Sequence, residues 1–326
     1  MGHSSSSPKW DIEKDIPNLE GKVVIVTGGN SGLGFATIQH LVRHGAKIYM
    51  GARSEAKAKE AIARLDFGLG KKGSVEWLEL DLGDPRKAKA AAERFLQKEK
   101  RLDILVNNAA LAIGPYAKTS DGIQDVMVVN HISPFVFTRT LLPLLKVTAK
   151  EPNTDVRIVS VSSASVTFVP ETVRFRNLED FNMEYSGTFA FMKRQGQAKL
   201  AIALVTKELQ RRFDAENIPI LSITLNPGTI NTEGNLALAS RQHWLLRPIF
   251  TWLSNHVTPS PAKGAYTQVF AAVSPIARKE KEKYGGAFLM PPAVVSKPCK
   301  ATENMELAAE LWKTTEDLLK EIGVEP

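Results

Sequence analysis

The sequence has little cysteine: Cys299 is the only one among its 326 residues. A single cysteine cannot close a disulfide within the chain, and such usage is typical of a reducing compartment. No motif around Cys299 would activate a thiol, so we interpret it as a bystander rather than a nucleophile. The fold must therefore depend on a buried core, which the length and the 43% hydrophobic composition allow.

Long apolar runs are also missing. No run reaches the ~18 residues that a membrane-spanning helix needs. The first residues, MGHSSSSPKWDIEKDIP, lack the apolar stretch of a signal peptide. We therefore expect a cytoplasmic protein without a membrane span, in which residues 1–20 form a flexible arm.

The chain has no dense cluster of charge, although its net charge is +7. Lysine and arginine are spread along the whole sequence, without a basic run interleaved with aromatic residues. Nucleic-acid binding is therefore not favoured, and no metal site is expected. A small anionic partner, such as a nucleotide, would account for part of the positive charge.

Strand-like and helix-like segments alternate from residue 21 onward. Seven apolar segments predict strands, at 22–27, 46–52, 75–81, 102–110, 156–163, 218–228 and 284–292. Helical periodicity follows most of them, notably at 54–65, 85–100, 126–145 and 196–213, and in the amphipathic segment that begins at Met305. This alternation predicts an α/β fold. We expect one Rossmann-type, doubly wound parallel sheet of about seven strands, covered by helices on both faces, in a single domain over 21–326.

A glycine-rich turn, VTGGNSGLGFA, joins the first predicted strand to the first helix. Gly28 permits the tight turn, Gly32 lets a phosphate approach the backbone, and Gly34 lets the helix pack closely on the sheet. The intervening Asn30, Ser31 and Leu33 complete the loop. A helix N-terminus at this point offers free N–H groups to an anion, which predicts nucleotide binding.

The spacing of Thr27 to Gly34, T-G-x-x-x-G-x-G, resembles that of the short-chain dehydrogenase/reductase family. The resemblance continues to about Pro292 and is closest to the retinol-dehydrogenase-like and fungal reductase branches, as in NSGLG and VNH. It implies hydride transfer between a nicotinamide dinucleotide and a carbonyl. Dimers and tetramers are common in the family, which leaves a homodimer or a homotetramer open.

The second predicted strand ends in MGAR, with Ala52 where an acidic residue would select NAD and with Arg53 after it. A guanidinium can pair with a 2′-phosphate, so we predict NADP(H); the alternative is a surface arginine that opens the next helix. The resemblance implies that Asp81 contacts the adenine, with Leu82 beside it. It places Asn108 and Ala109 at the ribose, in NNAA rather than the family's N-N-A-G. It also implies that the turn after the sixth strand presents these residues to the nicotinamide: Pro227, Gly228, Ile230 and Thr232.

The resemblance assigns catalytic positions to Asn130, Ser163 and Lys199. Asn130 would hold a water and position the lysine, or alternatively stabilise a helix irregularity. Ser163 would hydrogen-bond the substrate oxygen, although a helix-capping role and several neighbouring serines leave its assignment open. Lys199 would grip the nicotinamide ribose, which gives a lysine within an apolar helix face a polar partner.

Gln195 stands where the family has its proton-donating tyrosine, four residues before Lys199 and on the same helix face. An amide does not readily give up a proton. Loss of a general acid should slow the reaction by ~10²–10⁴, equal to about 3–5.5 kcal/mol of barrier. Tyr185 could supply the proton only by folding back into the cleft, and we interpret His131 as structural. Deliberate replacement of a tyrosine and natural repurposing explain Gln195 equally.

The segment 233–258 is strongly apolar and corresponds to the family's substrate lid. It predicts a hydrophobic or aromatic small-molecule substrate, unless it packs in the core or at a subunit interface. We therefore expect an NADP(H)-dependent oxidoreductase that acts on a carbonyl or an imine. Two alternatives stay open: an NADPH-binding pseudoenzyme or regulator, and a non-redox cyclase or isomerase that uses the same pocket.

Overall fold

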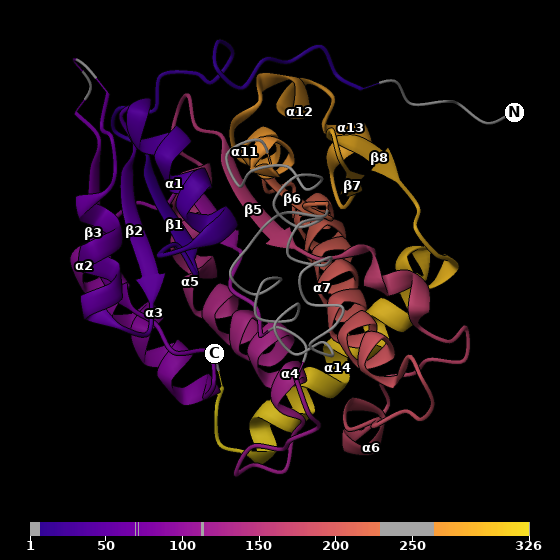
Figure 1. The fold of residues 1–326 in the computed structure, drawn as a ribbon. Coiled ribbons are helices and arrows are strands. Elements are labelled where there is room, and N and C mark those ends of the chain that lie inside the picture. Colours follow the sequence, from indigo (N-terminus) through magenta and orange to yellow (C-terminus); the bar gives the residue numbers. More distant parts are fainter. Residues whose placement is uncertain (1–6, 69, 71, 112–113, 229–263, 326) are drawn as a thin grey trace, which may run out of the picture.

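The computed structural model describes residues 7–68, 70, 72–111, 114–228 and 264–325, and they build one eight-stranded sheet (Figure 1). The strand order is β3-β2-β1-β4-β5-β6-β7-β8. All neighbouring pairs are parallel except the last, β7 with β8. The strands are β1 Val23–Thr27, β2 Lys47–Ala52, β3 Ser74–Glu79, β4 Ile104–Asn107, β5 Val156–Val161, β6 Ile220–Leu225, β7 Phe288–Met290 and β8 Val294–Ser296.

The central strands are buried along their whole length, as expected when helices cover both faces of a parallel sheet. One core cluster lies between the sheet and α3, α5, α7 and α14, and the other lies against α1, α2 and α11 (Figure 1). The described helices are α1 Gly32–Arg43, α2 Glu55–Ala63, α3 Pro85–Lys98, α4 Asp125–Met127, η1 Val128–Ile132, α5 Ser133–Ala149, η2 Ala164–Phe168, α6 Leu178–Phe181, α7 Ala190–Ala215, α11 Tyr266–Val273, α12 Pro275–Lys279, α13 Lys281–Tyr284, η3 Lys300–Glu303 and α14 Met305–Glu321.

The predicted doubly wound sheet is confirmed, with differences at its edge and in one helix. The segment expected as a strand over 284–292 is paired only at β7, because Pro291 and Pro292 have no N–H to continue the ladder. The chain then reverses and adds β8 as an antiparallel edge strand. The helix expected over 126–145 contains the π-helical turn η1, in which Asn130 lies. Such turns often mark functional sites.

The N-terminal segment differs from the expected flexible arm from Ser7 onward. Trp10 is buried, and its ring makes edge contacts with Tyr266 and Phe270 at centroid distances of 5.3 and 5.5 Å. Ile16 and Leu19 are buried in the same core cluster. Because three apolar side chains spaced along this short stretch can cover the outer edge of the α1–α11 layer, the segment packs on the domain.

The C-terminal helix α14 lies beside α7 and also covers part of α5 (Figure 1). Its Trp312 packs edge-on against Phe135 at 4.8 Å, and the Arg212 guanidinium lies 4.0 Å from the Trp312 ring centroid. One turn further along α14, Oγ1 of Thr315 lies 2.8 Å from Nε2 of His131. The helix thus reaches the turn that contains Asn130.

The hydrogen bonds of Thr315 fix the tautomer of His131. The single hydroxyl proton of Thr315 is donated to Leu311 O at 2.7 Å, so His131 Nε2 must be the donor in the other bond. Burial lowers the pKa of His131 to about 3, which keeps the ring neutral. This geometry supports the structural interpretation of His131.

We predict that Thr315→Val lowers the free energy of unfolding by ~1–3 kcal/mol, because it leaves the buried His131 Nε2–H without an acceptor. Denaturant unfolding at pH 7 measures the loss. Thr315→Ser keeps the acceptor and should recover most of it. Equal stability of the valine variant and the original chain would contradict the role of this bond.

Candidate active site

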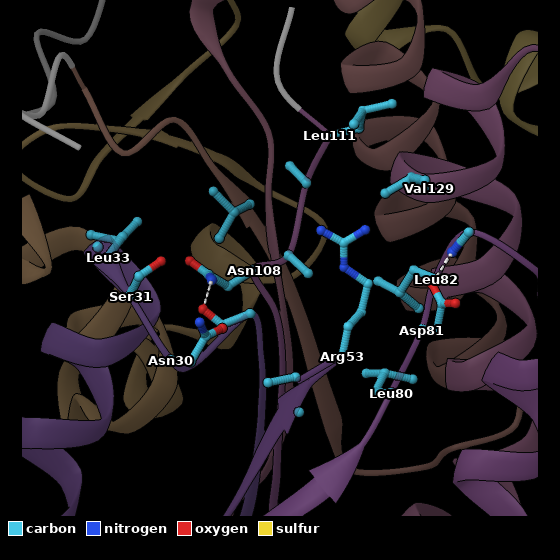
Figure 2. Close-up of a pocket in the computed structure, with 18 of the residues that line it drawn as sticks. Asn30, Ser31, Leu33, Arg53, Leu80, Asp81, Leu82, Asn108, Leu111 and Val129 are labelled. Carbon is cyan, nitrogen blue, oxygen red and sulfur yellow. Dashed lines mark hydrogen bonds between the residues drawn. The ribbon is translucent and has the colours of Figure 1, made fainter. Parts of the chain in front are cut away.

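A cavity of about 870 Å³ opens at the carboxyl ends of the central strands, where the connections on either side of β1 and β4 run to opposite faces of the sheet (Figure 2). In open α/β sheets this is the place where ligands bind. The cavity is lined by Gly28, Asn30, Ser31, Gly32, Leu33, Gly51, Ala52, Arg53, Ser54, Lys57, Leu80, Asp81, Leu82, Gly83, Asn108, Ala109, Ala110, Leu111, Val129, Val161, Ser162, Lys199, Pro227 and Gly228.

The glycine-rich turn forms one wall of the cavity, and two of its glycines are sterically required. Gly28 has φ +65°, and a Cβ there would lie 3.0 Å from Ala109 Cα. A Cβ on Gly34 would collide with the carbonyl oxygen of Gly28. Gly32 begins α1 with φ +55°. The side chain of Ser31 makes no capping bond, which leaves the first N–H groups of α1 available to an anion.

Thr27 joins this turn to the end of β4. Its Oγ1 accepts hydrogen bonds from the backbone N–H groups of Asn108 and Ala109, at 3.0 and 2.9 Å. The Asn108 side chain donates to Thr27 O at 2.8 Å. These bonds hold the two strand ends at fixed spacing, so the turn and the β4 loop form one rigid cradle.

The end of the cavity at β2 and β3 is charged. Arg53 lies in the cavity wall near Asp81 (Figure 2). Arg53 and Lys57 are both exposed, and neither forms an ion pair with any residue that the structure describes. Partial burial would raise the pKa of Asp81, but hydrogen bonds from Gly83 N and Lys87 Nζ, both 3.0 Å, hold it below its usual value. This end therefore presents two unpaired cations beside one stable carboxylate.

Lys199 lies at the opposite, inner end of the cavity. Its Nζ donates to Val161 O at 2.9 Å, and the side chain is buried. Burial lowers the pKa of Lys199 to about 8, and no charged side chain among the described residues adds to the shift. The lysine is therefore poised to exchange a proton near neutral pH.

Gln195 and Asn130 form a closed hydrogen-bonded cluster with the backbone of Leu111. Gln195 Nε2 donates to Leu111 O at 2.8 Å, and its Oε1 accepts from Asn130 Nδ2 at 3.3 Å. Asn130 Oδ1 accepts from Leu111 N at 2.7 Å. Neither side chain lines the cavity. Both amides are thus used to fix the loop that follows β4.

The serine nearest the cavity is not the one that the resemblance suggested. Ser162 lines the cavity, whereas Ser163 is half-buried beside it and does not. Ser162 Oγ donates its proton to Lys199 O at 2.8 Å. Ser163 Oγ accepts from Ser165 N at 3.1 Å and so caps η2, the alternative role considered from the sequence. The run of serines in VSVSSAS leaves this assignment open from the sequence, and the catalytic role of Ser163 stays a prediction.

The other predicted site residues divide by position. Tyr185 does not line the cavity. Burial, helped by the negative charge of Asp180, raises its pKa to about 12. Pro227 and Gly228 line the inner end as expected, whereas Ile230, Thr232 and the predicted lid at 233–258 lie outside the described residues.

Among the described residues, no group of three or more His, Cys, Asp or Glu side chains is placed to hold a metal ion. None of the helices in the same part of the chain has both the length and the apolar character to cross a bilayer.

Comparison with known proteins was made for the sequence and for the structure. The family model described as short chain dehydrogenase matches residues 22–173. A short-chain dehydrogenase/reductase of Armillaria gallica is 45% identical, with 97% of this chain and 98% of the relative covered. An uncharacterised oxidoreductase of Schizosaccharomyces pombe is 36% identical, with 87% and 80% covered.

Solved structures share the fold. A crystal structure of an uncharacterised protein from Mycobacterium paratuberculosis superposes with a TM-score of 0.69 at 28% identity, and 97% of this chain and 98% of that chain are covered. L-Sorbose reductase from Gluconobacter frateurii, complexed with NADPH and L-sorbose, superposes with a TM-score of 0.64 at 20% identity, over 86% and 98% of the two chains.

We predict that Gln195→Met lowers the free energy of unfolding by ~1–3 kcal/mol, since two hydrogen bonds are lost within a buried cluster. Amide hydrogen exchange should also become faster at Leu111, because its partner Asn130 is no longer held. Gln197→Met is the matched control: it removes a buried glutamine whose Nε2 donates to Asp180 O, away from the cavity. Faster exchange at Leu111 in both variants would contradict a local role for Gln195.

Proposed function

Because this chain belongs to the short-chain dehydrogenase/reductase family, we propose that it is an NADP(H)-dependent oxidoreductase. It transfers hydride between NADPH and a carbonyl or an imine of a hydrophobic small molecule. The observation that carries the proposal is one continuous cavity that runs from Arg53, past the glycine-rich turn, to the buried Lys199.

The walls of this cavity fit a dinucleotide. Gly28 and Gly34 let the turn pack tightly against the end of β4, and the first N–H groups of α1 can receive a pyrophosphate. Asp81 would face the adenine, and Asn108 with Ala109 would face the ribose. Pro227 and Gly228 would flank the nicotinamide, close to Lys199.

The charge at the adenosine end favours NADP(H) over NAD(H). Ala52 ends β2 without a carboxylate that would repel a 2′-phosphate. Arg53 and Lys57, which have no anionic partner among the described residues, could both approach that phosphate. A planar guanidinium pairs especially well with phosphate oxygens.

Exposed aromatic side chains lie on the elements that carry Ser163 and Gln195. Phe168, Phe189 and Phe191 are 40%, 56% and 36% exposed, and the rings of Phe168 and Phe189 lie 6.0 Å apart. Phe168 ends the short helix that Ser163 caps, and Phe191 lies one turn before Gln195. Exposed aromatics beside these positions support a hydrophobic or aromatic substrate.

The residues of the chain would divide the work as follows. When bound, the dinucleotide supplies the hydride. Lys199 would hold the nicotinamide ribose and carry an exchangeable proton, and Ser163, next to the cavity-lining Ser162, would orient the substrate oxygen. Gln195 and Asn130 act as positioning residues, because their amides fix Leu111 at the cavity wall. A cytoplasmic location and a homodimeric or homotetrameric assembly stay predictions.

We predict that Arg53→Ala weakens NADPH binding by ~10–100-fold and leaves NADH binding nearly unchanged, since it removes charge-assisted hydrogen bonds to the 2′-phosphate. Titration calorimetry with each dinucleotide measures both effects. Lys59→Ala, which removes a cation of α2 paired with Glu55, is the control and should bind both normally. An equal loss for NADPH and NADH would show that Arg53 does not select the phosphate.

The test of the function itself is NADPH oxidation by this chain and by Gln195→Tyr, against aromatic and terpenoid ketones, aldehydes and cyclic imines. We expect slow carbonyl reduction by the original chain and a gain of ~10² or more in the tyrosine variant, which regains a general acid. NADPH binding without turnover of any substrate by either protein would favour a pseudoenzyme. Product formation without loss of NADPH would favour a cyclase or an isomerase.

A further inference from the structure

We propose that the Lys199 ammonium donates its proton directly to the substrate oxygen, in place of the phenol that position 195 does not supply. This inference rests on the proposed function and names the acid of that site. It assigns to Lys199 a proton transfer of its own, beyond holding the ribose.

At the inner end of the cavity, the side-chain donors of Ser162 and Gln195 are already used, which points to Lys199 as the acid. The hydroxyl proton of Ser162 is already donated to Lys199 O, and the amide of Gln195 is bonded to Leu111 and Asn130 outside the cavity lining. The ammonium of Lys199 has three N–H donors, of which Val161 O takes one. Of the two donors that remain, one would hold the nicotinamide ribose and the other is left for the substrate oxygen.

Titratable groups on the neighbouring elements do not compete. Among the residues that the structure describes, the ionisable ones that line the cavity besides Lys199 are Arg53, Lys57 and Asp81, and all three lie at the adenosine end. On η1, which packs against α7, His131 is neutral because burial lowers its pKa to about 3. Lys193 and Arg194, on the same helix as Lys199, do not line the cavity, nor does Tyr185 ahead of it.

The environment of Lys199 suits an acid. Burial lowers the pKa of the ammonium to about 8, so the group gives up its proton more readily than an exposed lysine and is still largely protonated at pH 7. By comparison, the pKa of Tyr185 is raised to about 12. A general acid works best when its pKa lies near the operating pH. The pKa of Lys199 meets this condition, and that of Tyr185 does not.

The step balances as follows. The hydride leaves NADPH with the electron pair of its C–H bond, which leaves NADP⁺, and forms a C–H bond to the carbonyl carbon. The C=O π bond breaks, and its electron pair moves to oxygen. The oxygen forms an O–H bond with a proton from Lys199 Nζ, whose N–H bond breaks to leave a neutral amine. A proton from bulk solvent then restores the ammonium. An iminium ion whose nitrogen carries only carbon substituents is already positively charged there, so hydride transfer alone completes its reduction and no acid is required.

The contrast between these two substrates gives the test. With saturating NADPH, we compare the reduction of a ketone and of an N-alkyl iminium ion of similar shape by the original chain, Lys199→Arg and Lys199→Met. The arginine keeps the positive charge but is a far weaker acid. We expect ketone reduction to fall by ~10²–10⁴ in both variants. Iminium reduction should fall by less than about tenfold in Lys199→Arg, which keeps a cation at the nicotinamide ribose. Lys193→Met, on the same helix, should reduce both substrates normally.

The pH dependence follows with a defined sign. Ketone reduction requires the protonated lysine, so its rate should fall about tenfold per pH unit above the pKa of about 8, while iminium reduction stays level. A readout independent of turnover is the pKa of Lys199 in the protein without NADPH, followed by NMR after reductive ¹³C-methylation. The Lys199→Arg variant identifies the signal.

Each outcome is decisive. Equal loss of ketone and iminium reduction in the arginine variant would mean that Lys199 acts by binding or positioning alone, which overturns the proposal. A titration of Lys199 near 10.5, or a level pH profile with the ketone, would also overturn it. If neither substrate oxidises NADPH at any pH, the proposed function fails instead, and the two failures are distinguishable.

Discussion

The close packing of α7 on η2, the short helix that follows β5, is the constraint on which the inner half of the cavity depends. Gly196 makes this possible, since a Cβ there would collide with Ser165 O in η2. At this distance Ser162 Oγ reaches Lys199 O, and Lys199 Nζ reaches Val161 O. The lysine is therefore held within the sheet-facing layer, away from water, and its lowered pKa is a consequence of the backbone packing rather than of a charged neighbour.

The same packing decides what position 195 can do. One helical turn before Lys199, the Gln195 side chain meets the loop after β4 and binds Leu111 together with Asn130. A buried amide that lacks a hydrogen-bond partner would destabilise the fold. In the closed cluster the Gln195 amide has its partners, and it is therefore not available to a ligand. Chemistry at the inner end must then depend on groups that still face the cavity, and Lys199 is one of them.

Those features that follow from local sequence could be predicted, and those that depend on distant contacts could not. The strands and the glycine-rich turn are local, since apolar runs and residues with positive φ carry their own signal. The choice between Ser162 and Ser163 depends on where β5 ends relative to α7, which no periodicity reveals. The bond between His131 and Thr315 joins positions 184 residues apart. Likewise, the packing of Trp10 depends on a helix that begins at Tyr266.

The two ends of the cavity use positive charge in opposite ways. Arg53 and Lys57 are exposed cations at the rim, which suits recognition of a phosphate. Lys199 is buried, and its charge is conditional. A cation that must stay charged to bind belongs at the rim, where water stabilises it. A cation that must release its proton belongs in a buried position, where desolvation lowers its pKa. The fold meets both requirements by placing the first pair after an edge-side strand and the second group on a buried face of α7.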